Sequence, residues 1–385
     1  MNILLAPQAF KGSLSGMEAA KAMAEGVRRA APDAETVLLP VADGGDGTLD
    51  VLVSAPAPGN GTGGRYFEAT VTGPLGERRV ARWGATGHLR TAVIEMARAS
   101  GLALVPPDRQ NLRTATTYGT GELIRAALDA GYTDIIVGLG GSATNDGGVG
   151  MAQALGARLL DAAGRELPPG GAALALLESI DMESLDPRLQ KIRLRGATDV
   201  MNPFCGPQGA TRVYGPQKGA TPEMVAELDE ALRHYADVVL RELGIDILDL
   251  PGAGAAGGTG AGLVALLGGE LQPGADIVCD AVGLNHRLAN ADLVFTGEGR
   301  MDGQTLYNKA PFVVAQRAVA FGIPVIAVVG SLGPGHEGVL EHGIEAVEPA
   351  ATRGMPAEEA TARADALVRE AAERAMRGYL ARRRA

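Results

Sequence analysis

Short apolar runs alternate with longer amphipathic stretches at both ends of the chain. The continuous apolar runs are bounded by turn residues, which is typical of strands buried in a parallel sheet. Strands of this kind are expected over residues 3–6, 36–39, 293–296 and 325–329, and a last short strand is expected near 345–348. Apolar residues recur at helical spacing over 15–30, 311–321 and 356–381, and Ser15 stands where a helix N-cap belongs. Strand and helix patterns that alternate in this way predict one open α/β sheet built from both ends.

The middle of the chain has a different pattern. Residues 66–72, 78–83 and 90–96 predict strands separated by hairpin signals such as Gly73-Pro74. Further on, the pattern predicts helices over 117–130, from about 149, and over 222–243 and 262–267, with strands over 133–138 and 192–198. The fold class we expect is therefore α/β with two domains. An open three-layer α/β domain is formed by residues 1–64 plus 290–385, and a mixed α/β domain, 65–289, is inserted, with 54–64 as a linker.

Composition removes several classes of protein. Glycine accounts for 55 of 385 residues and proline for 22, which together stay below the share of low-complexity chains and show no collagen period. Aromatic residues at 4% and a net charge of −10 argue against a nucleic-acid partner. The apolar runs are too short for a membrane span, the amino terminus does not resemble a signal peptide, and two cysteines imply no disulfide framework. We therefore expect a cytoplasmic protein without a membrane or nucleic-acid partner.

Four glycine-rich loops carry the candidate chemistry. Each follows a predicted strand, contains acidic or hydroxyl residues and precedes a helix; they span 40–48, 138–148, 199–219 and 296–311. Free N–H groups at the start of a helix suit phosphate, and carboxylates nearby suit magnesium or a general base. Ordinary turns with an N-cap aspartate are the simpler explanation for any one loop. Four such loops in one chain favour a nucleotide together with a metal ion.

The lysines are few enough to be informative. The chain has 30 arginines but 5 lysines, and Lys11, Lys218 and Lys309 lie in glycine- and proline-rich loops. Lysine is a compact point charge that suits phosphate oxygens, so Lys11 and Lys309 are candidate phosphate ligands, with Lys218 less favoured. Residues 303–310 nearly fit a P-loop, but Asn308 stands where glycine belongs and Ala310 where a hydroxyl belongs.

In this order, the loops resemble the type 1 glycerate kinase family. The resemblance is carried by APQAFKGSL (6–14), ADGGDGT (42–48), GLGGSATNDGG (138–148), DVMNP (199–203), GPQKGA (215–220), residues 251–262 and TGEGRMDGQT (296–305). It implies transfer of the γ-phosphoryl group of ATP to D-glycerate with Mg²⁺, by two α/β domains, one discontinuous, with the site in the cleft. The sequence departs from the common family pattern at Gln8 and Ala9, which replace an Asp and a Ser, at Asp46, which replaces a Glu, and at Asn308.

Roles for single residues follow as hypotheses. Lys11, with Ser13, is expected to neutralise the glycerate carboxylate or the transferred phosphoryl group. Asp199 is the first choice for the catalytic base and Asp43 the second, while Glu298 with Asp302 is the choice for magnesium. The residues expected to hold the ATP phosphates are Gly140, Gly141, Ser142, Asn145, Asp146 and Lys309. Gly44, Gly45 and Asn202 complete the predicted substrate site.

Each role has a structural alternative. Asp43 and Asp199 could be loop caps, Glu298 could pair with Arg300, and Asp146 could cap the helix from residue 149. The glycines of 252–262 could serve close helix packing or ligand contact.

Other functions stay open at this level. The product is expected to be 2-phosphoglycerate, with a 3-phosphoglycerate-forming glycerate kinase as the alternative. More remote alternatives are a dinucleotide-dependent oxidoreductase and a non-catalytic small-anion binding protein. A homodimer is a possible assembly.

Overall fold

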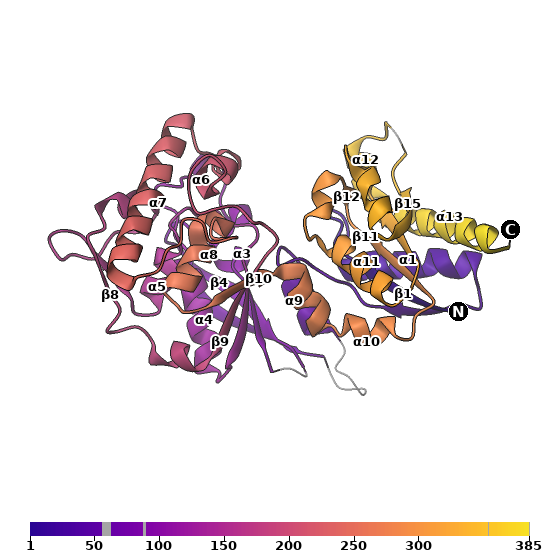
Figure 1. The fold of residues 1–385 in the computed structure, drawn as a ribbon, viewed down its shortest axis with the longest axis horizontal. Helices are drawn as coiled ribbons and strands as arrows, with labels where there is room; N and C mark the ends of the chain where they lie inside the picture. Colours follow the sequence, from indigo (N-terminus) through magenta and orange to yellow (C-terminus); the bar gives the residue numbers. More distant parts are fainter. Residues whose placement is uncertain (56–62, 88–89, 353, 385) are drawn as a thin grey trace. The chain divides into compact units, whose positions relative to one another are not determined.

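The computed structural model describes residues 1–55, 63–87, 90–352 and 354–384. By its internal contacts, the chain divides into two compact units (Figure 1). Unit 1 comprises Met1–Asp43, Asp50–Ala55 and Ala275–Ala385, and unit 2 comprises Gly44–Leu49 and Pro56–Gly274. The domain limits expected from the sequence, at 64/65 and 289/290, stay predictions. Most of the expected linker 54–64 lies outside the described residues.

Unit 1 is built on a parallel sheet of five strands in the order β15-β13-β11-β1-β2. The strands are β1 Asn2–Pro7, β2 Glu35–Leu38, β11 Leu293–Gly297, β13 Val325–Val329 and β15 Ile344–Pro349. All five correspond to predicted strands. β11 and β13 are buried along their whole length, as expected of strands covered on both faces.

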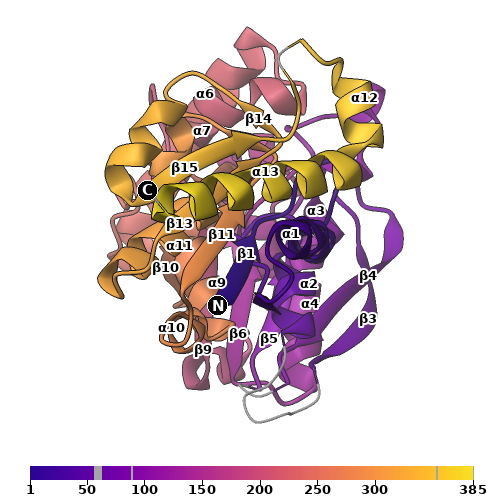
Figure 2. The ribbon, with the colours of Figure 1, turned by 90° about the vertical axis from the view of Figure 1, so that its right-hand side faces the viewer.

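Helices cover both faces of this sheet. α1 (Gly16–Ala30) and α13 (Ala364–Arg384) pack together on one face, where they share a core with Ile3, Leu5 and Phe295 (Figure 2). Because side chains alternate along a strand, the residues between these point to the other face, on which α11 (Ala310–Ala320) packs. The predicted open three-layer arrangement is therefore confirmed.

The ends of these helices show which sequence signals were sufficient to predict a helix boundary. Ser15 caps α1 in a reciprocal capping box with Glu18, as its position predicted. The predicted helix 356–381 is wrong as one element, because it is split into α12 (Ala357–Ala362) and α13. The break falls at Arg363, whose backbone (φ −107°, ψ 12°) leaves the helical region without a glycine or proline to announce it. Unit 1 also contains α10 (Leu284–Leu288) and nearly all of α9 (Gly274–Ala281).

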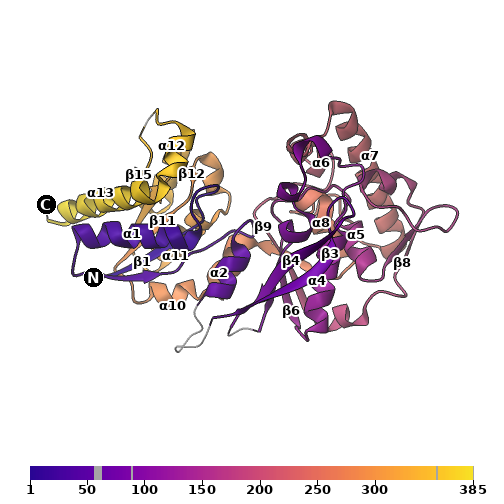
Figure 3. The ribbon, with the colours of Figure 1, turned by 180° about the vertical axis from the view of Figure 1, so that it is seen from behind.

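Unit 2 is built on a mixed sheet of six strands in the order β10-β9-β6-β5-β4-β3. β3 and β4 form the predicted antiparallel hairpin, β4 runs antiparallel to β5, and the remaining pairs are parallel (Figure 3). The strands are β3 Arg65–Thr72, β4 Arg78–Ala85, β5 Ala92–Glu95, β6 Asp134–Gly138, β9 Arg193–Thr198 and β10 Glu270–Pro273. A separate small hairpin joins β7 (Arg158–Leu160) to β8 (Ser179–Asp181).

The helices of unit 2 enclose its core. They are α3 Ala97–Ser100, α4 Tyr118–Asp129, α5 Val149–Ala154, α6 Ala210–Tyr214, α7 Pro222–Leu243 and α8 Ala255–Ala265. α7 agrees with its prediction because its ends are marked: Thr221 caps it, Pro222 opens it, and Gly244 ends it in the left-handed conformation. α2 (Thr48–Ser54) spans a division between the units.

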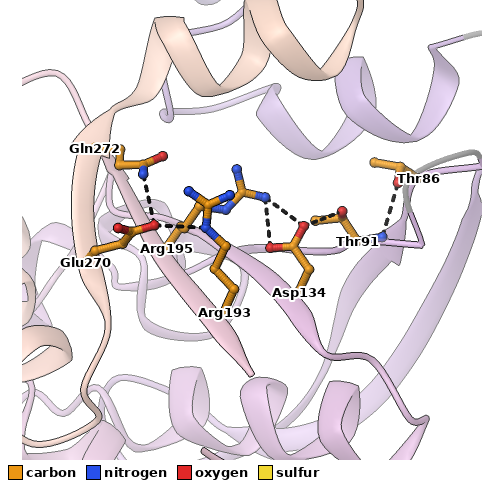
Figure 4. A network of polar contacts seen from close by, with 7 residues as sticks. All are labelled: Thr86, Thr91, Asp134, Arg193, Arg195, Glu270 and Gln272. Carbon is orange, nitrogen blue, oxygen red and sulfur yellow. Dashed lines mark hydrogen bonds and ion pairs between the residues drawn. The ribbon is translucent and has the colours of Figure 1, made fainter. Parts of the chain in front are cut away.

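Two sets of polar contacts lie on this sheet, one between β9 and β10 and one that joins β9, β6 and Thr91, the residue before β5 (Figure 4). Arg195 Nη2 donates to both carboxylate oxygens of Asp134, at 2.9 and 2.8 Å, and Thr91 Oγ1 donates to Asp134 Oδ2 at 2.6 Å. Arg193 Nε and Gln272 Nε2 both donate to Glu270 Oε1, each at 2.9 Å. Contacts of this kind between adjacent strands help fix their register.

Among the described residues, no helix has both the length and the apolar character that crossing a membrane requires.

Close packing of α1 against α13 depends on Gly26. A Cβ at this position would fall on the carbonyl oxygen of Arg369 and within 2.9 Å of Ala372 Cβ. At Gly378 of α13, the nearest atom to a Cβ would be Arg382 Nη1 at 3.6 Å, the flexible end of a side chain.

We predict opposite effects for alanine at these two helical glycines. Gly26→Ala should lower the free energy of unfolding by about 2 kcal/mol, because the helices must separate to admit the methyl group. The matched control Gly378→Ala should raise it by up to about 1 kcal/mol, the usual gain for glycine to alanine in a helix. Urea denaturation of both variants checks this; equal effects would contradict the packing argument.

Candidate functional site

Polar residues gather at the carboxyl ends of the parallel strands in each unit. In unit 1, Lys11 follows β1, Asp43 follows β2 and Glu298 follows β11. In unit 2, the loop 139–148 follows β6 and Asp199 follows β9. Ligands of open α/β sheets bind at this edge, so each group is a candidate ligand-binding region of its own unit.

Asp43 is positioned by the residue that departs from the family pattern. Gln8 Nε2 donates to Asp43 Oδ2 at 2.6 Å, and the Gln8 backbone N–H donates to Gly297 O at 2.8 Å. Asp43 is 8% exposed. The Gln8 Oε1 atom is buried and lacks a hydrogen-bond partner in the described part of the chain. The amide therefore orients a buried carboxylate and leaves one acceptor unused.

Glu298 is the most perturbed acid of unit 1. It is 6% exposed and accepts a hydrogen bond of 2.6 Å from Thr305 Oγ1. Burial raises the pKa of Glu298 to about 7, while Thr305 and Lys309 oppose the shift and the charges of Asp43 and Asp302 add to it. The structure thus brings together the acids predicted for magnesium, Glu298 and Asp302, with Lys309 and Asp43 near them.

Asp302 has a structural role as well. It caps the 3₁₀ turn Gly303–Leu306, where its Oδ1 accepts from the Gln304 N–H at 2.9 Å. Its Oδ2 lies 3.5 Å from Arg300 Nε. The ion pair considered from the sequence, Glu298 with Arg300, is replaced by this contact.

Lys11 and Lys309 occupy different settings. Lys11 is exposed in a tight loop, beside Gly12 at φ +80°, and Ser13 Oγ donates to Phe10 O at 3.0 Å. Lys309 is the N-cap residue of α11, so its charge lies at the positive end of that helix. Asn308, before it, has φ 57°, the left-handed conformation that asparagine tolerates in place of glycine.

Glycines of unit 2 let backbone segments meet closely. A Cβ on Gly44 would lie 2.8 Å from Ala197 O, and one on Gly140 would lie 2.7 Å from the Cα of Gly45. Gly44 and Gly140, both predicted to bind ligands, therefore allow the segment 44–45 to pack closely against Ala197 of β9 and against residue 140. Gly141 is exposed, with φ +70°.

Asp146 ties the starts of two helices together. Its Oδ2 accepts from the N–H and the hydroxyl of Thr117, both at 2.8 Å, and from the Gly150 N–H at 3.3 Å. Its Oδ1 accepts from the Gly148 N–H at 3.2 Å. Burial raises the pKa of this carboxyl group, and the four donors oppose the shift. The capping alternative is thus seen in the structure, and contact of Asp146 with a nucleotide stays a prediction.

Lys218 is a functional candidate that the site prediction omitted. It is 4% exposed, and its Nζ donates to Ser142 Oγ and to the Thr144 carbonyl oxygen, both at 2.8 Å. Burial lowers the pKa of Lys218 to about 7, although the charge of Asp146 opposes the shift. The rarity of lysine in this chain was the signal that could have placed it in the site.

Asn145 and Asn202 are held by side-chain partners. Asn145 is 1% exposed, and its Nδ2 donates to Thr211 Oγ1 at 2.9 Å. Asn202 Oδ1 accepts from the Tyr214 hydroxyl at 2.6 Å, and its Nδ2 donates to Gln208 O at 2.8 Å. Burial, and then the charge of Asp199, raise the pKa of Tyr214. Asp199 therefore lies near this group, at the end of β9.

The glycine run at 252–262 serves close packing. Ala256, Gly257 and Gly258 have φ of 56°, 68° and 86°, so α8 starts earlier than predicted and is kinked. A Cβ on Gly257 would fall on the Thr144 carbonyl oxygen, and one on Gly262 on the Gly147 carbonyl oxygen. α8 thus lies directly against the loop 139–148.

A metal site made of protein ligands alone is not found. Among the described residues, no three histidine, cysteine or acidic side chains come together as a set that could hold a metal ion. Glu298 is a buried carboxylate with Asp302 close enough for its charge to act on it, and Mg²⁺ commonly uses one or two carboxylates together with substrate phosphates. The residues present therefore fit magnesium in that mode.

Comparisons with known proteins give one answer. The model of the glycerate kinase family matches residues 3–380. Glycerate 2-kinase of Escherichia coli K12 is 50% identical over 347 residues, which cover 90% of each chain. Glycerate kinase of Bacillus subtilis 168 is 51% identical over 360 residues, covering 94% of this chain and 93% of the relative. A crystal structure from Salmonella typhimurium LT2 that carries the name glycerate kinase 2 superposes with a TM-score of 0.87, at 48% identity and full coverage of both chains.

The burial of Lys218 predicts a pH dependence of stability. Its pKa is about 7 in the folded chain against an ordinary value of 10.5, so between these values the unfolded chain binds the extra proton. Stability should therefore rise with pH across this window, by up to about 1.4 kcal/mol per pH unit from this group. Urea denaturation of the wild type and Lys218→Met between pH 6.5 and 9 checks it. As pH rises, the free energy of unfolding of the wild type should increase relative to that of the variant. A difference that does not change with pH would contradict the lowered pKa of Lys218.

Proposed function

Because the chain belongs to the glycerate kinase family, we propose that this enzyme transfers the γ-phosphoryl group of ATP to the 2-hydroxyl of D-glycerate. The observation that carries the proposal is the family match over residues 3–380. The choice of 2-phosphoglycerate rests on the name of the Escherichia coli relative, a glycerate 2-kinase that is 50% identical.

Charge neutralisation is the main requirement of such a reaction. Both substrates are anions, whereas the chain carries a net charge of −10, so named groups must supply local positive charge. In unit 1, Lys309 serves the ATP phosphates, because it adds its charge to the amino-terminal end of α11. Lys11, exposed in its loop beside Ser13, serves the glycerate carboxylate or the transferred phosphoryl group.

Unit 2 supplies hydrogen-bond donors. The loop that carries Gly140, Gly141, Ser142, Asn145 and Asp146 serves the ATP phosphates through its backbone N–H groups and the Ser142 hydroxyl. Gly141 is the exposed member of this set, and the others are largely or wholly enclosed. For glycerate, the unit offers Asn202 and the backbone at Gly44 and Gly45.

Glu298 and its neighbours fit magnesium. Glu298 would hold the ion. The charges of the nearby carboxylates Asp302 and Asp43 raise the pKa of Glu298, so a cation would be favourable beside it. When bound, magnesium neutralises charge on the phosphate oxygens. Within the protein, Thr305 orients Glu298 through its hydroxyl hydrogen bond of 2.6 Å.

A carboxylate must accept the proton of the attacking hydroxyl. Asp199 is the first choice, because it is half-buried at the end of β9 and lies near Tyr214 and Asn202. Asp43 is the second choice, and the hydrogen bond from Gln8 fixes one of its oxygens.

The product identifies both the reaction and its position. We expect the protein, incubated with ATP, Mg²⁺ and D-glycerate, to release ADP and to give 2-phosphoglycerate by ³¹P and ¹³C NMR. A product phosphorylated at the 3-hydroxyl would correct the position alone. An absence of ADP release that depends on glycerate would refute the proposed reaction.

We predict that Asp199→Asn lowers kcat by about 100-fold or more, the usual contribution of a general base. The KM for glycerate should change little, because the amide keeps the size of the side chain. Asp237→Asn, at an exposed position of α7, is the matched control and should behave as the wild type. Steady-state kinetics decide, and near-normal turnover of Asp199→Asn would transfer the role to Asp43.

A further inference from the structure

We propose that the charged Lys218 side chain is a positioning group for the nucleotide: it fixes residues 142–144, directs the Ser142 hydroxyl hydrogen toward a bound phosphate oxygen and supplies the positive charge that this phosphate requires. The inference rests on the proposed function, since it takes the loop 139–148 as the phosphate-binding loop. It adds a cation to that loop which comes from another part of the chain, the turn Pro216–Lys218.

The geometry connects the turn to the loop at two points. Lys218 Nζ donates to Ser142 Oγ and to Thr144 O, both at 2.8 Å. All three residues are buried: Lys218 is 4% exposed, Ser142 6% and Thr144 0%. Hydrogen bonds from a charged donor are short and strong, so the ammonium group holds this part of the loop firmly.

The turn itself is rigid. The Lys218 N–H donates to Gly215 O at 3.0 Å, and the Gly219 N–H donates to Pro216 O at 3.1 Å. Gly219 follows in the left-handed conformation at φ +84°, and a Cβ there would lie 3.1 Å from Gln110. The Lys218 backbone is thus fixed, and the side chain reaches the loop from a defined origin.

The hydrogen bond to Ser142 determines what that hydroxyl can do. In its charged form, which a bound anion favours, the Lys218 ammonium group only donates, so Ser142 Oγ accepts from it and the Ser142 hydrogen is left to donate. In the described part of the chain, no acceptor for that hydrogen is found. Thr144 Oγ1 is likewise buried without a hydrogen-bond partner among these residues. Two hydroxyl groups beside a buried cation therefore have unused hydrogen-bonding capacity.

Loop stability alone does not explain a charge at this position. No ion pair joins Lys218 to a carboxylate among the described residues, and the acid whose charge acts on it, Asp146, already accepts four hydrogen bonds. A buried and unpaired ammonium group opposes folding. A neutral donor would hold Ser142 and Thr144 with a smaller penalty. An anion at the loop explains the charge, because it would complete the pairing.

Four variants test the role. Lys218→Met removes donor and charge, Lys218→Gln retains a neutral donor, Ser142→Ala removes the hydroxyl, and Lys191→Met is the control at an exposed lysine of the same unit. We expect the Kd for ATP, by calorimetry, and the KM for ATP to rise about tenfold or more in the first three variants. The KM for glycerate should stay near the wild-type value, and Lys191→Met should change neither constant.

The double variant Lys218→Met/Ser142→Ala distinguishes a shared action from two separate ones. Its Kd for ATP should be about that of Lys218→Met alone, because Ser142 acts with Lys218. Three results would overturn the proposal and leave Lys218 a structural role. They are a Kd for ATP in the double variant that combines the full losses of both single variants, normal ATP affinity in Lys218→Gln, and equal losses of affinity for ATP and glycerate. If Lys218→Met does not fold, as judged by circular dichroism, Lys218→Gln and Ser142→Ala carry the same comparison. If the wild type phosphorylates glycerate and the variants bind ATP as tightly as the wild type does, this inference alone is refuted. If the wild type does not bind ATP, both the inference and the proposed reaction are refuted.

Discussion

The direction of parallel strands is the constraint on which the rest of this structure depends. In unit 1, β1, β2 and β11 all end at one edge of their sheet, and this brings Lys11, Asp43 and Glu298 to neighbouring positions although the last is far along the chain. Strands β6 and β9 of unit 2 do the same for the loop 139–148 and Asp199. The order of the strands, more than any single loop, assembles each group.

Each of these two groups contains one buried ionisable side chain whose surroundings disfavour its charged form. Glu298 is enclosed with Asp43 and Asp302 nearby, which favours its protonated form, and Lys218 is enclosed without a paired carboxylate among the described residues, which favours its neutral form. In each case, a ligand of the missing sign would restore the ordinary charge: a cation at Glu298 and an anion near Lys218. Substrates of a kinase bring both signs, as a phosphate chain and its magnesium ion.

The sequence was informative where the determining contacts are local. The cap at Ser15, the ends of α7 and the buried runs of β11 and β13 each depend on residues within a few positions, so pattern alone predicted them. Contacts between distant residues gave no such signal. Lys218 meets Ser142 across 76 residues, and Gln8 meets Asp43 across 35, so neither pairing could be predicted from spacing. The break at Arg363 lacks a glycine or proline and was missed for that reason.

The abundance of glycine shows how these local and distant determinants combine. Gly44, Gly140, Gly257 and Gly262 each meet another backbone segment where a Cβ would collide. Their main effect is to let the segment 44–45, the loop 139–148 and α8 approach one another at backbone distance. That packing fixes where Ser142 and Gly141 lie, and the loop can then offer a preformed set of donors without further ordering. In this chain, the glycines allow the close packing that positions the candidate phosphate loop, and the proposed roles of Lys218 and Ser142 add to the backbone donors that the loop presents.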